Sequence, residues 1–465
     1  MVFDEVFSRF IEESPVSVMY RGVLENIFSA ERLDRMFEET AERQVSGDLL
    51  FSTCADLLGL VVTGSHKSVN SAYRRRRKEV GVAVKSVYNK LSGIETAVSE
   101  RMVRDTACDL TAIVENMGAR CQSPLAGYEV RIVDGNHLRA TDHRIKELRD
   151  VGAAPLPGHA LAIWNPQTEL IEDVIACEDG HASERSLFPQ LLENVERGQC
   201  WIEDRNFCTF DFLWKIKHTK KAYFVARQHG SLQGPLIGKR RNLGRIETGV
   251  VYEQSMKLSD QTGRKLIVRR ITVRLDEPTR DGDQELHVLT NLPVRVSGKR
   301  IARLYADRWQ IEAAFRELAT ALRSEINTLG YPRAALFGFC LAVVSYNVLN
   351  VVRGALHKAS DKGNDGDKEA RKFSTYYLSE EIAGVYRGMM IAIPAEHWVE
   401  PFATLTPKQL ATKLLWLAKQ VDFDVFYTNP YTPKPTSREK KPQRRRKGKH
   451  VSTYKLLQTR ATTSK

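Results

Sequence analysis

The chain has 465 residues (52.8 kDa), more than a single hydrophobic core usually serves, so about two to four domains are expected. Its composition, 42% hydrophobic and 27% charged, argues against wholesale disorder, and the excess of 70 Lys and Arg over 57 Asp and Glu favours a polyanionic partner such as nucleic acid. The N-terminus is acidic and lacks an apolar run, so it does not resemble an export signal. The seven cysteines contain no CxxC pair and indicate neither a disulfide framework nor a zinc finger. Both observations predict a cytoplasmic protein.

Residues 1–125 are predicted to form a helical DNA-binding domain, because apolar residues recur at helical spacing through most of this segment. Two short helical stretches flank Gly81 within it. The first stretch carries a basic block made of Arg74, Arg75, Arg76, Arg77 and Lys78. Both a helix-turn-helix and a solvated basic helix face fit this pattern.

Residues 126–230 change to short segments rich in β-formers and are predicted to be the first part of an α/β core. The strand YEVRIVD is followed by a hairpin, then by a helix and the strand CWIED, and finally by the strand in KAYFVARQ. Three antiparallel strands, a helix and a further strand are the order of an RNase H-like mixed sheet.

Residues 231–284 are predicted to be a β-strand insertion in this core, with strands in TGVVYEQSMKL and RKLIVRRITVRL. Ahead of these strands, GPLIGKRRNLGR is basic but lacks the spacing of a phosphate-binding loop. We therefore expect no bound nucleotide, and interpret this segment as a loop that faces DNA.

Residues 285–358 are predicted to complete the core, with the strand ELHVLTNL and a long helix from Ser297 into the middle 320s. An apolar run after Ala335 is close to the length of a membrane span. It contains Ser345, Asn347 and Asn350, which favour a buried core helix, and we expect no membrane partner.

Residues 359–465 are predicted to be a helical C-terminal domain with a basic tail. Helices are expected in LSEEIAGVYRGMM and ATKLLWLAKQ, after the linker SDKGNDGDKEA. Between Lys434 and Lys449 the tail holds nine Lys or Arg and one acid, so we expect a disordered basic arm.

Two aspartates stand at the ends of predicted strands. Asp134 ends YEVRIVD and Asp204 ends CWIED, and adjacent parallel strands would present both side chains at one edge of the sheet. Phosphodiester transfer requires an activated nucleophile and a stabilised leaving oxygen, which two divalent ions on carboxylates can supply. An aspartate at a strand end is also an ordinary turn or cap residue, so neither is assigned alone.

The predicted long helix offers a third acid. At about 100° per residue, an apolar stripe that can pack on the sheet adjoins a polar face. The polar face carries Tyr305, Arg308, Glu312, Arg316 and Arg323. Glu312 and Arg316 are also an ordinary i, i+4 pair, so a solvated face remains an alternative.

Together these segments resemble a known family. YADRWQIEAAFREL resembles the Y-R-E-K motif of bacterial insertion-sequence DDE transposases, the cut-and-paste group that works through DNA hairpins. IVDGNHL and IEDRNF resemble the two aspartate motifs of the same group. The resemblance covers about residues 126–355, and the long interval before Glu312 accommodates the β insertion typical of these relatives.

The resemblance implies an RNase H-like catalytic core between helical domains, in which Asp134, Asp204 and Glu312 bind two Mg²⁺ ions, with Mn²⁺ as a substitute. Water would cut one strand, and the freed 3′-hydroxyl would attack the opposite strand to form a hairpin, which is reopened before the end joins target DNA. Tyr305 and Arg308 would grip phosphates near a displaced base. A homodimer on double-stranded DNA is implied, in the nucleoid of a bacterial cytoplasm.

One position departs from the motif, because Ala319 stands where the family has Lys. Arg316 or Arg323, on either side of it, is our hypothesis for a replacement. Trp201 and Trp309 can stack a base, but they fit core packing as well, so the base-stacking residue is not identified. His137 and His181 are likewise left unassigned, since structural histidines fit both positions.

The predicted function is a metal-dependent DNA transposase that binds the terminal inverted repeats of an insertion sequence, cleaves them and transfers the ends to target DNA. A non-catalytic DNA-binding protein derived from a transposase is the alternative, and a simpler metal nuclease is a third interpretation. The terminal repeat, the target preference and the present mobility of the element cannot be predicted from the sequence.

Overall fold

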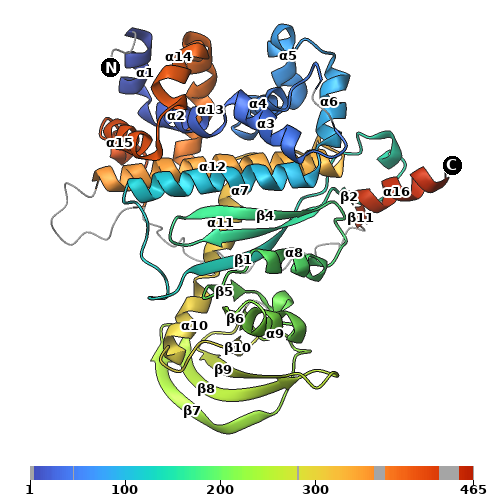
Figure 1. Ribbon diagram of the computed structural model, residues 1–465, viewed down its shortest axis with the longest axis vertical. Coiled ribbons are helices and arrows are strands. Elements are labelled where there is room, and N and C mark those ends of the chain that lie inside the picture. Colours follow the sequence, from blue (N-terminus) through green and yellow to red (C-terminus); the bar gives the residue numbers. More distant parts are fainter. Residues whose placement is uncertain (1–4, 45–46, 280–281, 361–371, 429–449, 464–465) are drawn as a thin grey trace, which may run out of the picture.

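The computed structural model describes residues 5–44, 47–279, 282–360, 372–428 and 450–463. Its centre is a mixed sheet of nine strands, crossed by a layer of two long helices with further helices beyond them (Figure 1). The fold is therefore of the predicted α/β, mixed-sheet class. The predicted linker, from residue 361 on, and the predicted basic arm up to residue 449 lie outside the described residues.

The described chain before the sheet is helical, and local sequence sets the helix ends. Ser29 and Ser68 each accept an N–H bond at a helix start, and Gly81, at a φ of 71°, ends a helix in the left-handed conformation that glycine tolerates. The predicted pair of helices around Gly81 is confirmed. The helices are α1 (Glu5–Glu13), α2 (Pro15–Ile27), α3 (Ala30–Thr40), α4 (Phe51–Val62), α5 (Val69–Val80), α6 (Val84–Gly93) and α7 (Thr96–Asn116).

Half of the large sheet has the predicted strand, hairpin and parallel strands. It contains β1 (Val130–His137), β3 (His159–Asn165), β4 (Leu170–Cys177), β5 (Cys200–Glu203) and β6 (Tyr223–Arg227). The strand order is β4-β3-β1-β5-β6; β3 is antiparallel to both of its neighbours, whereas β1, β5 and β6 run parallel. Parallel strands need crossover connections, and these carry α8 (Phe188–Glu193) and α9 (Phe210–His218), with short helices η2 (Glu184–Leu187) and η3 (Arg205–Phe207) before them.

The other half continues the same sheet through β10 (Glu285–Thr290), which is antiparallel to both β6 and β9. Beyond it lie β9 (Lys265–Leu275), β8 (Gly249–Ser259) and the edge strand β7 (Leu236–Ile246). The interpretation of GPLIGKRRNLGR as a loop is wrong, because most of this segment is β7. Pairing with β8, interrupted by two register shifts, holds this polar and largely exposed segment in a β conformation that its composition does not favour.

Alternate residues of the strands enter two different cores. Ile132 belongs to the large core that includes α7 and the helix α12 (Pro332–Ser360), and Val133 belongs to the smaller core under α8 and α9. This alternation is the period of two that a β-strand imposes on its side chains. Both faces of the strands around β1 are therefore covered by helices.

The apolar helix α12 is a core helix, as predicted. It is long and apolar enough to cross a membrane, but the whole of its most apolar window is buried inside the protein. Its polar residues form hydrogen bonds with the adjacent hairpin. The Asn347 amide accepts from the Ile171 N–H at 2.9 Å and donates to the Ile171 carbonyl at 2.8 Å. Asn350 donates to the Glu169 carbonyl. These bonds satisfy the otherwise unpaired backbone of the edge strand β4.

A buried acid joins α7 to the same edge strand. Glu100 accepts a hydrogen bond from the Ala176 N–H at 2.8 Å, and burial raises the pKa of its carboxyl group to about 7, against the effect of that hydrogen bond. The folded protein therefore holds this proton at pH values where the unfolded chain has lost it.

Replacing Glu100 with Gln is expected to make the protein more stable near neutral pH, because the amide is neutral and can still accept the Ala176 bond. Folding raises the pKa of this acid from about 4.3 in the unfolded chain to about 7. As the pH rises between these two values the protein therefore loses stability, here on the order of 2 kcal/mol. Urea unfolding of both proteins between about pH 4 and pH 8 measures the difference, which should vanish at the acidic end. The exposed Glu38→Gln is the control, and a difference that does not depend on pH would contradict the assignment.

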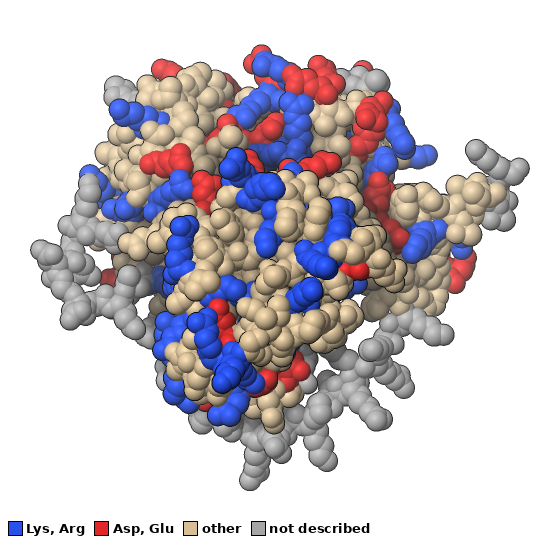
Figure 2. Space-filling model, turned by 60° about the horizontal axis from the view of Figure 1, so that its bottom comes forward, with Lys and Arg blue, Asp and Glu red and all other residues tan. Residues whose placement is uncertain are grey.

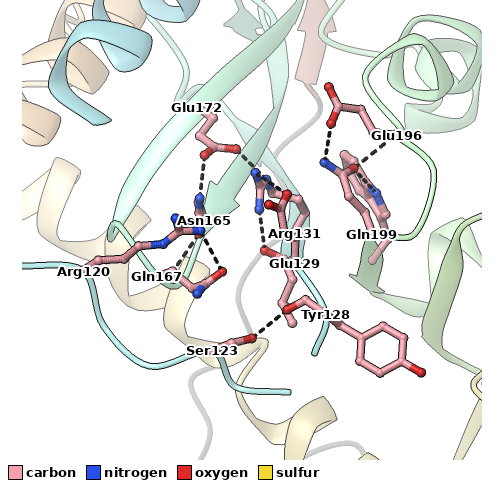
Figure 3. Close-up of polar contacts among 12 residues, drawn as sticks. Arg120, Ser123, Tyr128, Glu129, Arg131, Asn165, Gln167, Glu172, Glu196 and Gln199 are labelled. Carbon is pink, nitrogen blue, oxygen red and sulfur yellow. Dashed lines mark hydrogen bonds and ion pairs between the residues drawn. The ribbon is translucent and has the colours of Figure 1, made fainter. Parts of the chain in front are cut away.

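At the opposite end of the hairpin from the predicted acids, a polar network fixes the register of three strands. Figure 3 shows Arg131 of β1 reaching Glu172 of β4, with an Nε to Oε2 distance of 2.5 Å. The other Glu172 oxygen accepts from the Asn165 amide at 2.6 Å, and Asn165 in turn accepts the Gln167 N–H in the turn. A one-residue slip would break this network and reverse the faces of each strand.

The predicted long helix is interrupted. Helix α10 (Gly298–Ala306) ends before Asp307, and α11 (Trp309–Thr320) begins after Arg308, so the expectation of one helix into the 320s is wrong. At the junction the backbone bonds tighten to i, i+3 spacing, including Arg308 N–H to the Tyr305 carbonyl and Ile311 N–H to the Arg308 carbonyl. The break accompanies ion pairs that hold Arg308 against the sheet.

The predicted C-terminal helices form and pack on the first helices of the chain. They are α13 (Thr375–Ala392), α14 (Glu396–Trp398), the π-helical turn η5 (Val399–Ala403), α15 (Pro407–Ala418) and the short η6 (Phe423–Val425). The Phe7 ring of α1 lies 4.7 Å from the Trp398 ring, centroid to centroid, and the Asn26 side chain of α2 donates to the Phe402 carbonyl. The first helices of the chain and the helices from α13 to α15 thus share one hydrophobic core (Figure 1).

Replacing Gly22 with Ala is expected to destabilise this junction, by about 1–3 kcal/mol. A Cβ at Gly22 would lie inside van der Waals contact with the buried Phe402 ring, which is itself packed against Trp398. Thermal unfolding measures the loss. Gly388 of α13 is the matched control, because a Cβ there meets open space and alanine favours a helix; equal effects at both positions would contradict the packing.

The last described residues pack beside the loop that follows β1, at one side of the molecule (Figure 1). The strand β11 (His450–Ser452) pairs in parallel with β2 (Ala154–Leu156), and α16 (Thr453–Thr463) contacts η1 (Lys146–Leu148). The Lys455 ammonium lies 3.0 Å from an Asp179 carboxylate oxygen. The sequence does not predict this attachment, which fixes the chain end beside the loop that follows β1.

Candidate active site

Two of the predicted acids lie beside one another on neighbouring strands, but the expectation that Asp134 ends its strand is wrong, because β1 continues to His137 in its pairing with β3. Asp134 lies on β1, and Asp204 directly follows β5, whose Glu203 is opposite Val133 in the parallel ladder. Asp134 is mostly buried, and one of its oxygens accepts the Gly135 N–H at 2.9 Å. The parallel pairing of β1 with β5 ends at Val133 and Glu203, so Asp134 and Asp204 are the next residues on two neighbouring strands.

The third acid comes from α11, which packs against β1. Arg308 joins it to the first: its Nη1 lies 2.6 Å from Asp134 Oδ2, and its Nη2 lies 2.6 Å from Glu312 Oε1. Arg308 is only 8% exposed, so this double ion pair is shielded from solvent. The structure therefore brings Asp134, Asp204, Glu312 and Arg308 into one cluster, which we call the acid cluster.

The electrostatics of the acid cluster reflect crowded negative charge. Burial raises the pKa of Asp134 to about 7 against the opposing charge of Arg308 and the Gly135 hydrogen bond, and the charges of Asp204 and Glu312 raise it further. Burial alone would lower the pKa of Arg308, but Tyr305 and the three acids raise it above its ordinary value. The ionised carboxylates of such a cluster are strongly stabilised by a nearby positive charge.

The oxygen donors of the acid cluster suit a hard divalent ion such as Mg²⁺, which prefers carboxylate ligands. In the part of the chain that the structure describes, no three His, Cys, Asp or Glu side chains are gathered closely enough to hold a metal ion. The Arg308 guanidinium lies between Asp134 and Glu312, where it satisfies part of the charge demand. The oxygen atoms of the acid cluster are therefore suitable metal ligands, but the side chains are arranged around the Arg308 guanidinium.

Tyr305 also lies at the acid cluster, but it does not share one exposed helix face with the other predicted residues. It belongs to the last turn of α10, is 5% exposed, and its ring centroid is 5.9 Å from the Arg308 guanidinium carbon. Burial raises the pKa of its hydroxyl to about 12. Tyr305 is therefore a buried neutral support for Arg308.

The two arginines proposed to replace the missing lysine are separated in the structure. Arg316 is exposed on α11, whereas Arg323 lies beyond the end of that helix. The Arg323 N–H donates to the Val62 carbonyl and its Nη1 donates to the His66 carbonyl, both at 2.9 Å. The expectation of one helical face for both residues is wrong, because α11 ends at Thr320 and tertiary contacts direct Arg323 toward α4.

The basic block of α5 is not brought to the acid cluster. Arg74, Arg75, Arg77 and Lys78 are exposed, and Arg76 pairs with Asp56 and Glu79. Helix α5 lies across the α7 and α12 layer from the sheet (Figure 1). On the face drawn in Figure 2, Lys and Arg gather in several groups with Asp and Glu between them, so positive charge is distributed over the molecule.

Near the predicted acids, one residue is more exposed than expected and a further acid is buried. Trp309 is 53% exposed directly after Arg308, so its assignment to core packing is wrong, whereas Trp201 is buried. Glu203, next to Asp204, is fully buried with no hydrogen-bond partner for either carboxylate oxygen among the described residues, and burial raises its pKa well above the ordinary value. Glu203 stands two residues after Trp201 in β5, on the same face of a strand that is buried on both faces, and this spacing is the signal that could have placed it inside.

Comparison with known proteins supports the family that the motifs resemble. Residues 125–348 match the family described as Transposase DDE domain. A protein named as a transposase, y4zB of Sinorhizobium fredii, is 28% identical over 161 residues, which are 34% of this chain and 43% of that protein. Transposase InsG for insertion sequence element IS4 of Escherichia coli is 25% identical over 153 residues, 32% of this chain and 33% of that protein.

These matches cover less than half the length of either curated relative. The region matched by the family contains the strands from β1 to β10, both aspartates, the α10–α11 junction and Glu312. These similarities support an insertion-sequence DDE transposase domain in the part of the chain that carries the acid cluster.

Proposed function

We propose that this protein is a magnesium-dependent transposase that cuts the ends of an insertion sequence and joins them to target DNA. The observation that carries the proposal is the convergence of Asp134, Asp204 and Glu312 around Arg308, where the parallel pairing of β1 with β5 ends. The family match over the same region supports it, as do the names of the relatives. A non-catalytic descendant has no need to keep all three acids.

In this proposal Asp134, Asp204 and Glu312 would hold two Mg²⁺ ions, which would supply activation of the attacking hydroxyl and stabilisation of the leaving oxygen. Arg308 exchanges Asp134 and Glu312 for a DNA phosphate, a geometry for which a guanidinium is suited. Tyr305 orients Arg308 through its ring. The exposed ring of Trp309 is available to stack a displaced base beside the cut.

The remaining parts of the chain have proposed roles around this centre. The helices of residues 1–125, with the α5 basic block, would bind the terminal repeats, and strands β7–β9 within residues 231–284 are interpreted as the insertion in the core. Residues 359–465 would contribute to a homodimer that holds two DNA ends. We infer a cytoplasmic protein that works on the nucleoid, since its partner is double-stranded DNA.

The proposal is tested with the full chain, Mg²⁺ and a duplex taken from the DNA that flanks the gene. A transposase cuts at a defined end and yields hairpin and strand-transfer products. Cutting without joined products would indicate a simpler nuclease, and binding without cutting would indicate a non-catalytic DNA-binding protein. Either of these results would overturn the proposed function.

A further inference from the structure

A cavity of about 410 Å³ opens two turns along α11 from Glu312. Three segments line it: the loop between α4 and α5, residues 138–141 after β1, and residues 323–328 after α11. Ala319 also lines it, at about 10 Å along the helix from Glu312 at the usual rise per residue. The cavity therefore adjoins the acid cluster but belongs to a different set of residues.

The charged lining of the cavity is mostly basic. Lys67, Arg139 and Arg323 contribute three positive charges, and Glu325 is the one acid among its lining residues, all of which the structure describes. The Arg139 Nε lies 3.0 Å from Glu325 Oε2, and Arg323 donates one Nη to the His66 carbonyl. Lys67 is exposed and has no ion-pair partner in the described part of the chain, so its ammonium is available to a ligand.

Two of the lining residues carry hydroxyl groups without hydrogen-bond partners in the described part of the chain. Thr141 is 7% exposed, and its Oγ1 is buried with no hydrogen-bond partner among the described residues; the Thr328 Oγ1 is in the same situation. A hydroxyl can donate to an anionic oxygen, and a buried hydroxyl without a bond costs free energy until it does so. Cations beside free hydroxyl donors are the chemistry of a site for a tetrahedral oxyanion.

We propose that this cavity binds a backbone phosphate of the DNA strand, and that Lys67 supplies the positive charge that Ala319 lacks. The inference rests on the proposed transposase function and names a residue for it. Arg316 does not line the cavity, and Arg323 lines it with part of its guanidinium already bonded, whereas Lys67 is free. The loop between α4 and α5 thus contributes directly to the surface that holds DNA beside the acid cluster.

The test measures how tightly the full chain binds a duplex from the flanking DNA across a salt series. Lys67→Ala is expected to weaken binding about tenfold at about 0.1 M salt and to reduce the slope of log affinity against log salt by about one, the signature of one lost phosphate contact. Ala319→Lys, which places an ammonium on another wall of the same cavity, is expected to restore both quantities in the double variant. A merely structural role for Lys67 would not be rescued in this way.

The exposed Lys265 at the start of β9 is the control, because it does not line the cavity and Ala319→Lys should not alter the effect of Lys265→Ala. Unchanged affinity and slope in Lys67→Ala would overturn the site while leaving the proposed function in place. A Lys67→Ala variant that loses stabilisation by inorganic phosphate but binds the duplex normally would also overturn it, in favour of a free anion. A wild-type chain that does not bind the duplex would overturn the proposed function and this site together.

Discussion

Replacing Asp204 with Asn is expected to reduce Mg²⁺-dependent cutting of the terminal duplex by about a thousandfold or more, while duplex binding stays intact. A carboxylate that shares two divalent ions contributes several kcal/mol to the transition state, and each 1.36 kcal/mol is a factor of ten in rate. Asparagine keeps the shape but removes the charge. The fold should survive, because Asp204 caps η3 with its backbone carbonyl and makes no capping bond with its side chain.

Cutting is measured by the release of labelled end fragments, and binding by the retardation of the same duplex. Asp211→Asn is the matched control, since Asp211 is an exposed carboxylate on α9 that pairs with Lys215 and Arg264 away from the acid cluster. It should cut at the wild-type rate. Wild-type cutting by Asp204→Asn would remove the second acid from the mechanism.

The placement of the two aspartates could be predicted from the sequence because local patterns determine it. YEVRIVD and CWIED are short segments rich in residues that favour strands, and the hairpin and crossover helix between them allow the two strands to run parallel as neighbours. Asp134 and Asp204 each follow the paired part of these two strands, so they had to be close once the strands were adjacent, although β1 itself continues to His137. The family resemblance then selected Glu312 from several acids on the following helix.

The junction at Asp307 and Arg308 could not be predicted, because helical periodicity continues through it. Tyr305 and Glu312 have the spacing of one helix, and nothing in YADRWQIEAAFREL marks a break. The break accompanies contacts with residues far away in the sequence, above all Asp134. Such contacts leave no periodic trace, and the same holds for Arg323, which bonds to Val62 and His66 instead of continuing the helix.

The packing of α1 and α2 on the C-terminal helices also could not be predicted from the sequence. Each helix has an apolar face that predicts burial, but a face does not identify its partner. The edge strand β7 was missed for the opposite reason, since KRRNLGR is too polar to suggest a strand and takes its conformation from β8. Apart from β7, local sequence determines which helices and strands form. The fold determines which of them pack together.

Replacing Arg308 with Ala is expected to destabilise the metal-free protein by about 3 kcal/mol and to increase the stabilisation that Mg²⁺ provides. Without the guanidinium, Asp134 is left buried without its cation, and the cost of an unpaired buried charge exceeds that of a surface pair. A divalent ion would then meet the three acids without displacing a resident cation. Thermal unfolding at increasing Mg²⁺ concentration measures both effects.

Arg303→Ala provides the control, because Arg303 makes a comparable double contact with Glu247 on the surface, where solvent screens the ion pair. Its response to Mg²⁺ should match that of the wild type. If Mg²⁺ stabilised Arg308→Ala no more than the wild type, Arg308 would not compete with the ion for the acids. If the competition holds, the enzyme without DNA keeps its acids occupied by its own arginine, and a phosphate that draws Arg308 away prepares the site for metal at the moment DNA arrives.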